Sequence, residues 1–311
     1  MQTEEKRLKN KLIQTAIKAV STKIYDKEEQ ITMAFACVLA NGHLLIEDKP
    51  GLGKTTLANA MSDVLGLKFG RIQFTSDMLP SDVLGVSIFQ PNTSDFKFFK
   101  GPIFTQLLLA DELNRGTPRT QSALLEAMAE KQVSVDGHTY QLQRPFFVIA
   151  TQNPTDESGT FPLPDSQLDR FSISLSLGYP SVEAERRLYS EDFTNKSSQP
   201  IETLIDAEQL KSIQILTEKI HASDEVLDYL QLLVNQTRTH NLLVDGLSPR
   251  AGLAMFRISQ ALAYIEGRDF VVPEDVKKAF LPIAKHRMRS RSAQHKASDI
   301  LEKLLHETRI P

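Results

Sequence analysis

The chain has 311 residues, of which 41% are hydrophobic and 24% are charged, a composition typical of a globular protein with a substantial core. Its formal net charge is only −3, so no overall electrostatic field would draw it to nucleic acid or to an anionic membrane surface. The single cysteine, Cys37, excludes an internal disulfide framework and agrees with a cytoplasmic location.

Targeting and metal-binding signals do not emerge from the sequence. No apolar stretch approaches the ~20 residues that a membrane-spanning helix requires, and the charged start Met1–Arg7 lacks the apolar core of a signal peptide. The seven histidines are scattered along the chain, which disfavours a zinc site. We therefore expect a cytoplasmic protein without membrane insertion.

The first part of the chain is expected to begin with a helix and to continue with alternating strands and helices. Residues 1–22 have the pattern of a charged, amphipathic helix. From there to about residue 180, helical patterns alternate with short apolar runs that indicate strands, at residues 43–46, 71–75, 106–110, 146–151 and 172–177. This alternation predicts an α/β fold with a doubly wound parallel sheet.

The most informative segment of the chain runs from Leu44 to Thr56. A short apolar strand leads into a turn with Gly51 and Gly53, and then into a helix. Such glycines let successive backbone N–H groups point into one concavity, and the helix N-terminus favours an anion there. The usual pattern of such a loop has a further glycine where this chain has Asp48.

The segment therefore predicts a phosphate-binding loop for a nucleotide. The loop consists of Pro50, Gly51, Leu52, Gly53, Lys54, Thr55 and Thr56. In such a loop Lys54 reaches the outer phosphates, and the Thr55 hydroxyl can hold a Mg²⁺ ion.

Two carboxylates follow the apolar run Leu107–Ala110 and supply what hydrolysis needs. Asp111 and Glu112 stand at the C-terminal end of this predicted strand, where α/β folds place their ligands. Asp111 can join the Mg²⁺ shell, and Glu112 is placed to polarise an attacking water. Taken alone, the pair could also be an acidic strand-to-helix turn.

Another predicted strand, Phe146–Thr151, ends in side-chain amides. A neutral donor such as Asn153 can contact the γ-phosphate and orient the water without titrating. Because Asn153 precedes a proline, an Asx-type turn explains it equally well when it is taken alone.

The pattern changes after Gly178–Pro180, where strand signals largely disappear. Helix starts are indicated at Ser223–Glu225, Ser248–Pro249 and Val272–Asp275, and the polar stretch from 193 to 200 predicts a loop. We expect two domains: a nucleotide-binding α/β domain over residues 1–180 and an all-helical domain over residues 181–311.

Taken together, these segments resemble the MoxR family of AAA+ ATPases. The matching motifs occur in the order typical of the family and cover Ala110–Arg115, Gln121–Met128, Ala150–Pro154, Phe161–Pro164, Gln167–Phe171 and Leu177–Pro180. The MoxR version of the phosphate loop commonly carries an aspartate at the position of Asp48. The resemblance implies a three-layer P-loop NTPase core followed by an α-helical lid. It also implies an ATP hydrolase that drives chaperone-like remodelling or activation of partner proteins, sometimes partners with a von Willebrand factor A domain.

The same resemblance implies roles for two arginines. Arg170 matches the arginine finger, which reaches from one subunit into the nucleotide site of a neighbour, and Arg250 matches the sensor-2 arginine at the start of a lid helix. A finger shared between subunits implies a closed ring, and the family usually forms hexamers. For each arginine, a surface salt bridge is the alternative explanation. The segment Ile24–Glu29 departs from the family pattern, so no adenine contacts are inferred.

Two predicted hairpins match insertions of this family. Val133–Tyr140 contains Asp136–Gly137, which suits a two-residue type I′ turn, and it resembles the hairpin that precedes sensor 1, at about 131–145. A second pair of strands lies within the insertion at about 85–102. Its aromatic residues could grip a substrate at a central pore or belong to the core; they are Phe96, Phe98 and Phe99.

Two other classes of protein stay open at this point. A DNA-associated AAA+ motor or loader is suggested by the basic run Lys285–Arg291, although a solvated helix end is the commoner meaning of such a run and no DNA-binding motif accompanies it. A P-loop kinase acting on a small molecule is the third class, and the two hairpins argue against it. Nucleic acid is therefore not the expected partner.

Overall fold

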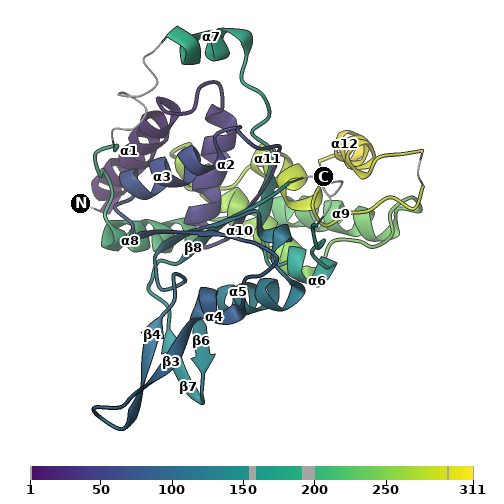
Figure 1. The fold of residues 1–311 in the computed structure, drawn as a ribbon. Helices are drawn as coiled ribbons and strands as arrows, with labels where there is room; N and C mark the ends of the chain where they lie inside the picture. Colours follow the sequence, from purple (N-terminus) through teal and green to yellow (C-terminus); the bar gives the residue numbers. More distant parts are fainter. Residues whose placement is uncertain (1, 154–158, 191–199, 293, 311) are drawn as a thin grey trace.

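The computed structural model describes residues 2–153, 159–190, 200–292 and 294–310. A five-stranded parallel sheet lies at its centre, with the strand order β2-β5-β8-β1-β9 (Figure 1). The strands are β1 (Leu44–Glu47), β2 (Phe69–Gln73), β5 (Leu107–Asp111), β8 (Phe147–Gln152) and β9 (Ile173–Leu175). Each of the five strands predicted from the apolar runs is confirmed, with its ends displaced by at most two residues.

Both faces of this sheet are buried, which explains why its strands are almost continuously apolar. Leu107 and Leu109 of β5 point into one hydrophobic cluster, while Leu108 and Ala110 point into the other. Because successive side chains of a strand point to opposite faces, each strand contributes to two cores. The predicted α/β class is therefore confirmed, with a core on either side of the sheet.

Helices cover the two faces of the sheet unequally (Figure 1). One face packs against α1 (Gln2–Ser21), α2 (Glu28–Leu39) and α3 (Lys54–Val64). The other face packs against the short α4 (Pro80–Leu84) and against α5 (Pro118–Glu130). A 3-10 turn, η1 (Leu113–Arg115), follows β5, and α6 (Asp165–Leu168) precedes β9.

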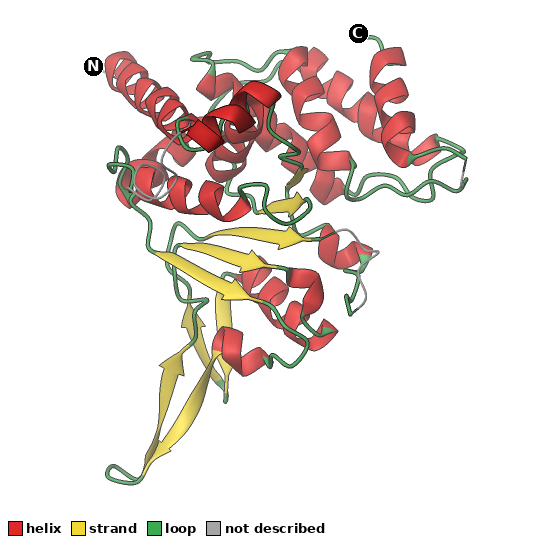
Figure 2. Ribbon diagram, turned by 45° about the horizontal axis from the view of Figure 1, so that its top comes forward, coloured by secondary structure: helices red, strands yellow, loops and turns green. Residues whose placement is uncertain are grey.

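Two β-hairpins project from the edge of the sheet on the side of α4 and α5 (Figure 2). The first pairs β3 (Gly85–Gln90) with β4 (Asp95–Lys100), and the second pairs β6 (Gln132–Val135) with β7 (His138–Gln141). Asp136 and Gly137 have φ values of 51° and 78°, as a type I′ turn requires. Both predicted hairpins are therefore confirmed.

The aromatic residues of the first hairpin divide between the two predicted environments. Phe98 stacks on Tyr140 of the second hairpin with ring centroids 4.2 Å apart, so it joins the two hairpins. Phe96 and Phe99 are 67% and 43% exposed. The core interpretation is therefore correct for Phe98 and wrong for the other two.

Every described element after β9 is a helix. These are α7 (Val182–Ser190), α8 (Ala207–Glu218), α9 (Asp224–Thr239), α10 (Pro249–Ile265), α11 (Pro273–Ala284) and α12 (Ala297–Glu307). Three of them begin where the capping patterns predicted, and Ser248 caps α10 by accepting a hydrogen bond from the Ala251 N–H at 3.1 Å. The predicted loop at 193–200 lies almost wholly outside the described residues.

The helical part of the chain is packed onto the N-terminal helices. The long helix α10 contacts both α2 and α11, and all three contribute to the larger hydrophobic cluster. Cys37 of α2 is fully buried in this cluster, and burial raises the pKa of its thiol. None of the helices in the described part of the chain is both long and apolar enough to cross a membrane.

Candidate functional site

The loop between β1 and α3 has the backbone of an anion site. Gly51 and Gly53 adopt φ values of 83° and 88°, a left-handed conformation that glycine adopts without steric cost. A side chain added at either glycine would meet no atom within 4 Å, so the space beside the turn is open to a ligand. Gly53 is the N-cap of α3, and the positive end of the helix dipole therefore points into that space.

Lys54 lies at the start of α3, where its ammonium group belongs to the same site. Its side chain is buried, and Nζ donates to the Asp48 carbonyl oxygen at 2.7 Å and to Asn153 Oδ1 at 3.3 Å. Both acceptors are neutral oxygens, and phosphate oxygens would bind the same ammonium group more strongly because they are charged. The contact with Asn153 also brings two predicted site residues together.

Asp48 has a structural role that the sequence did not reveal. Its buried carboxylate accepts hydrogen bonds from the Ser176 hydroxyl at 2.7 Å, from the Leu177 N–H, and from the Gly178 N–H at 3.3 Å. A buried carboxylate requires such donors because it has lost its hydration. Asp48 thereby connects the start of the phosphate loop to the segment that follows β9.

The two carboxylates after β5 are held by β8, the neighbouring strand. The Thr151 hydroxyl donates to Asp111 Oδ1 at 2.6 Å and accepts from the Glu112 N–H at 2.8 Å. Asn153 Nδ2 donates to Glu112 Oε1 at 3.3 Å. Because Asn153 also contacts Lys54, one amide connects the lysine of the loop with the carboxylate predicted to act as the base.

Glu112 has a left-handed backbone with a φ of 53°. For a residue other than glycine this conformation costs about 1–3 kcal/mol and persists only where neighbouring groups enforce it. The Thr151 hydroxyl that receives its N–H is such a group. The strained turn aims the Glu112 side chain at Asn153 rather than along the strand.

Two arginines that were not predicted balance the carboxylates. Arg71 of β2 pairs with Asp111 Oδ2 at 2.7 Å, and Arg115 pairs with Glu112 Oε2 at 3.1 Å. The contact with Arg71 shows that Asp111 can face a positive charge at this position. Arg71 reaches Asp111 because β2 lies beside β5, which no local pattern indicates. Arg115 reaches Glu112 across the turn η1, at a spacing of three residues, so only this second ion pair could have been found from the sequence.

The residues at this edge of the sheet fit a nucleotide with Mg²⁺. Among the described residues, no group of three or more His, Cys, Asp or Glu could hold a metal ion. Mg²⁺ does not need such a group, because it typically takes one or two protein oxygens, several waters and phosphate oxygens. Asp111 and the hydroxyl of Thr55, in the first turn of α3, can supply the protein oxygens.

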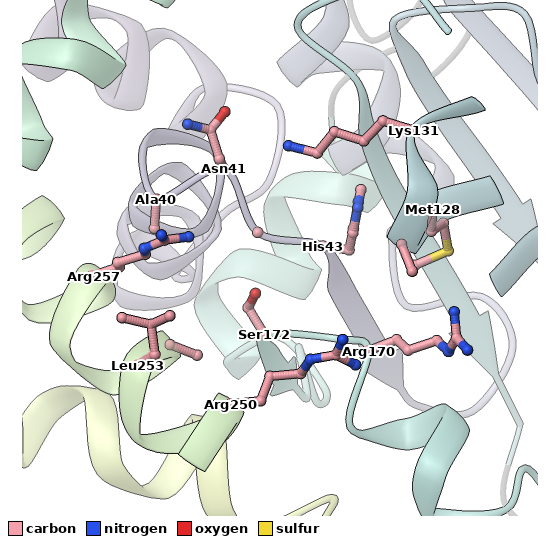
Figure 3. A pocket seen from close by; sticks show the side chains of 13 residues that line it. Ala40, Asn41, His43, Met128, Lys131, Arg170, Ser172, Arg250, Leu253 and Arg257 are labelled. Carbon is pink, nitrogen blue, oxygen red and sulfur yellow. The ribbon is translucent and has the colours of Figure 1, made fainter. Parts of the chain in front are cut away.

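The other two predicted arginines lie at the opposite edge of the sheet. Arg170 precedes β9 and Arg250 begins α10; both line a cavity of about 260 Å³ next to His43, which precedes β1 (Figure 3). Because the strands are parallel, their amino ends all lie at this edge. The phosphate loop follows the carboxyl end of β1 and therefore lies at the other edge. The structure therefore does not bring Arg170 or Arg250 together with Lys54 of the same chain.

This cavity is strongly cationic. Among the described residues, four positive side chains and no carboxylate line it; the four are Lys131, Arg170, Arg250 and Arg257 (Figure 3). Arg170 donates to the Leu125 carbonyl oxygen at 2.7 Å, and its buried Nε has no partner among the described residues. Within the described part of the chain, neither Arg170 nor Arg250 forms an ion pair, which argues against the salt-bridge alternative for both.

The basic run Lys285–Arg291 is largely engaged within the protein. The Arg287 side chain is 5% exposed and pairs with Asp169 at 2.8 Å, and Arg289 pairs with Asp165. Arg291 donates to the Leu243 carbonyl at 2.7 Å. The interpretation as a solvated helix end is therefore wrong for Arg287, whereas Lys285, Arg289 and Arg291 are exposed as that interpretation expects.

The fold and the site together define an AAA+ ATPase, and the comparisons agree with this class. Residues 43–173 match the family model "ATPase family associated with various cellular activities (AAA)". Residues 235–304 match the model "AAA lid domain".

Relatives narrow the class to a family. The chain is 44% identical over 280 residues to the uncharacterized Bacillus subtilis protein YeaC, covering 89% of this chain and 87% of the relative. It is 36% identical over 286 residues to the chaperone MoxR1 of Mycobacterium tuberculosis, covering 89% and 75%. A solved structure from Cytophaga hutchinsonii, provisionally described as an ATPase, superposes with a TM-score of 0.90 at 33% identity and covers 99% and 98% of the two chains. The chain belongs to the MoxR family of AAA+ ATPases, and it binds and hydrolyses ATP.

Proposed function

We propose that this ATPase works as a ring, in which ATP bound by one subunit is hydrolysed with help from its neighbour and the energy remodels or activates partner proteins. The observation that supports this proposal is the separation of two charged half-sites within one chain. The phosphate loop lies at the carboxyl end of β1, and the cationic cavity lies at the amino end of the same strand. A head-to-tail contact between copies would join the two halves.

In this proposal one subunit supplies the binding and the base. The loop Pro50–Thr56 surrounds the phosphates and Lys54 pairs with the outer ones. Thr55 and Asp111 would hold Mg²⁺, which would neutralise phosphate charge. Glu112 takes a proton from the attacking water. Asn153, which contacts both Lys54 and Glu112, keeps the water in line with the γ-phosphate.

The neighbouring subunit supplies positive charge. Arg170 and Arg250 face its partner's nucleotide from the cationic cavity, where Arg170 counters the charge that develops on the transferring phosphoryl group. We propose a hexamer, the usual state of the family. The proposed division into an α/β domain (1–180) and a helical lid (181–311) places the two arginines on different domains, so the relative position of core and lid would control both.

Partner proteins are the proposed substrates of the ring. The support is the similarity to MoxR1, which is described as a chaperone, and the hairpin of β3 and β4, which projects from the sheet (Figure 2) and exposes Phe96 and Phe99. We propose that this hairpin contacts the client, and that a von Willebrand factor A domain protein is a candidate partner. A cytoplasmic location stays a prediction from cysteine usage.

A complementation experiment tests the shared site. Lys54→Ala subunits keep the arginines and lose their own nucleotide site, whereas Arg170→Ala subunits do the reverse. Each variant alone is expected to lack ATPase activity. Mixed in equal amounts they should recover about a quarter of the wild-type rate, because a random interface joins the two intact halves in one of four cases.

A mixture of Lys54→Ala with Glu112→Gln is the matched control and should stay inactive, because both changes damage the same half. Absence of recovery in the first mixture would contradict the shared site. A species that stays monomeric by light scattering at micromolar protein with ATP and Mg²⁺ would contradict the ring.

A further inference from the structure

Asp169 connects the two segments that carry the arginines of the cationic cavity. It immediately precedes Arg170, in the chain between α6 and β9. Its two carboxylate oxygens lie 3.1 and 3.0 Å from the Ser248 hydroxyl, which donates to them. Ser248 caps α10, and Arg250 lies in the first turn of that helix. One carboxylate therefore holds the start of the helix that carries Arg250 and the backbone next to Arg170.

Arg287 in turn holds the Asp169 carboxylate. Its Nε donates to Asp169 Oδ1 at 2.8 Å, and its remaining N–H groups donate to the carbonyl oxygens of Ile283 at 2.6 Å, Ser172 at 3.2 Å and Phe171 at 2.5 Å. The guanidinium group thereby bridges the end of α11 and the segment that enters β9. Burial lowers the pKa of Arg287 and the contact with Asp169 raises it.

An arrangement of this kind fixes geometry more than it adds stability. Arg287 is 5% exposed and Asp169 is 22% exposed, so the pair has lost much of its hydration and its net contribution to the free energy of folding is small, whereas removal of Asp169 leaves an uncompensated buried charge. Arg287 uses its donors in several directions at once, which restricts where Asp169 can lie. The pair therefore constrains the position of Arg170 relative to Arg250.

We propose that Asp169, held by Arg287, is a positioning residue that keeps Arg170 and Arg250 in one fixed arrangement facing the neighbour's nucleotide. The inference rests on the proposed shared site. It also gives a role to the buried arginine of the run Lys285–Arg291, which the proposed function does not otherwise use.

The Asp169→Asn variant tests this role, because it keeps the shape of the side chain and removes the charge that Arg287 requires. We expect kcat to fall about 10- to 100-fold, the usual result of displacing catalytic groups by about 1 Å. The affinity of the variant's own site for ATP, measured by equilibrium binding, should not change. Mixed with Lys54→Ala, the variant should recover activity; mixed with Arg170→Ala it should not, because both changes then damage the same half.

A second carboxylate paired with an arginine provides the matched control. Asp275 is also hydrogen-bonded to an arginine, Arg268, at 2.7 Å, and it lies in the first turn of α11, away from the cavity lining. The Asp275→Asn variant should lose thermal stability, as removal of a buried partner does. Below its melting temperature the variant should keep the wild-type kcat. In a mixture with Lys54→Ala, the ATPase rate should be no higher than the Asp275→Asn subunits alone would give.

The possible results separate the two proposals. If Arg170→Ala and Lys54→Ala recover activity together but Asp169→Asn and Lys54→Ala do not, Asp169 is not a positioning residue for the shared half. If neither mixture recovers, the shared site itself is overturned, and this inference with it. Should Asp169→Asn fail to fold, Arg287→Lys decides by the same mixtures, because it keeps the charge beside Asp169 and loses the carbonyl contacts.

Discussion

The edge of the central sheet at the carboxyl ends of its strands and the edge at their amino ends differ in how charged side chains are paired. At the carboxyl edge, the Lys54 ammonium group and the carboxylates Asp111 and Glu112 all have partners within the chain. At the amino edge, the cavity collects four cations and no carboxylate lines it. The first edge is electrostatically complete in one subunit. An anion from outside the chain would relieve the repulsion between the like charges at the second edge.

This difference underlies the proposed shared site, in which the phosphate loop of one copy would meet the cationic cavity of another. In the proposed function the carboxyl edge binds ATP and positions a base, and its two arginines, Arg71 and Arg115, pair with Asp111 and Glu112. Arg170 and Arg250, which form no ion pair with any described residue, line the cavity at the other edge, at the amino ends of the strands. A reaction that requires both edges therefore depends on contact between copies.

The largest effect should come from removing the lysine of the carboxyl edge. Lys54→Ala deletes a buried charge that pairs with phosphate, a loss of about 2–5 kcal/mol, or about 30- to several thousand-fold in ATP affinity. ATP hydrolysis should disappear with it. Titration with a fluorescent ATP analogue measures the affinity directly.

Lys131→Ala is the matched control, since this lysine belongs to the amino edge. Its removal should leave the ATP affinity of a single subunit unchanged. An equal loss of affinity in the two variants would contradict the division of the site between the edges.

The next effect separates binding from hydrolysis within the carboxyl edge. Glu112→Gln keeps the shape of the side chain but cannot accept a proton, so the hydrolysis rate should fall about 10²- to 10⁴-fold while ATP stays bound. Single-turnover hydrolysis with radiolabelled ATP measures both quantities. Arg115→Ala, which frees Glu112 of its ion pair, should change the rate less than tenfold. A Glu112→Gln enzyme that hydrolyses at the wild-type rate would show that another group acts as the base.

Much of the fold could be predicted because its signals are local. The buried strands appear as apolar runs, Gly51 and Gly53 mark the phosphate loop, and the Asp136–Gly137 turn marks a hairpin. These patterns depend on neighbours a few residues away. The residues Lys54, Asp111, Glu112 and Asn153 follow from the same reasoning, since each stands at the end of a strand or the start of a helix.

The partners of these residues could not be predicted, because they depend on which strands become neighbours. The Asp48 carboxylate finds its donors after β9, and Arg287 finds its carboxylate before β9. Nothing in the local sequence of Lys285–Arg291 distinguishes a solvated arginine from one buried against Asp169. The placement of Arg170 and Arg250 at the edge opposite Lys54 likewise follows only from the strand order and the packing of α10.

The smallest expected effect concerns stability at the amino edge, where His43 lies in the cavity wall. Burial, with a further contribution from Lys131, lowers the pKa of His43 to about 4, and its Nδ1 accepts a hydrogen bond from the Val148 N–H at 3.1 Å. In the unfolded chain His43 becomes protonated near pH 6.5, whereas in the folded chain it stays neutral until the pH falls to about 4. The contribution of His43 to the free energy of unfolding is therefore present above pH 6.5 and is lost as the pH falls towards 4, by at most about 1.4 kcal/mol per pH unit.

His43→Gln should remove this part of the pH dependence, because glutamine does not titrate. Urea unfolding between pH 4.5 and 7.5 measures it as a flatter dependence of the free energy of unfolding on pH. Part of the slope should persist, since burial also lowers the pKa of His286. His138→Gln, on the exposed hairpin, is the control and should keep the full slope. If the pH dependence of the free energy of unfolding is unchanged in His43→Gln, His43 is already protonated in the folded protein. The amino edge would then tolerate a further positive charge.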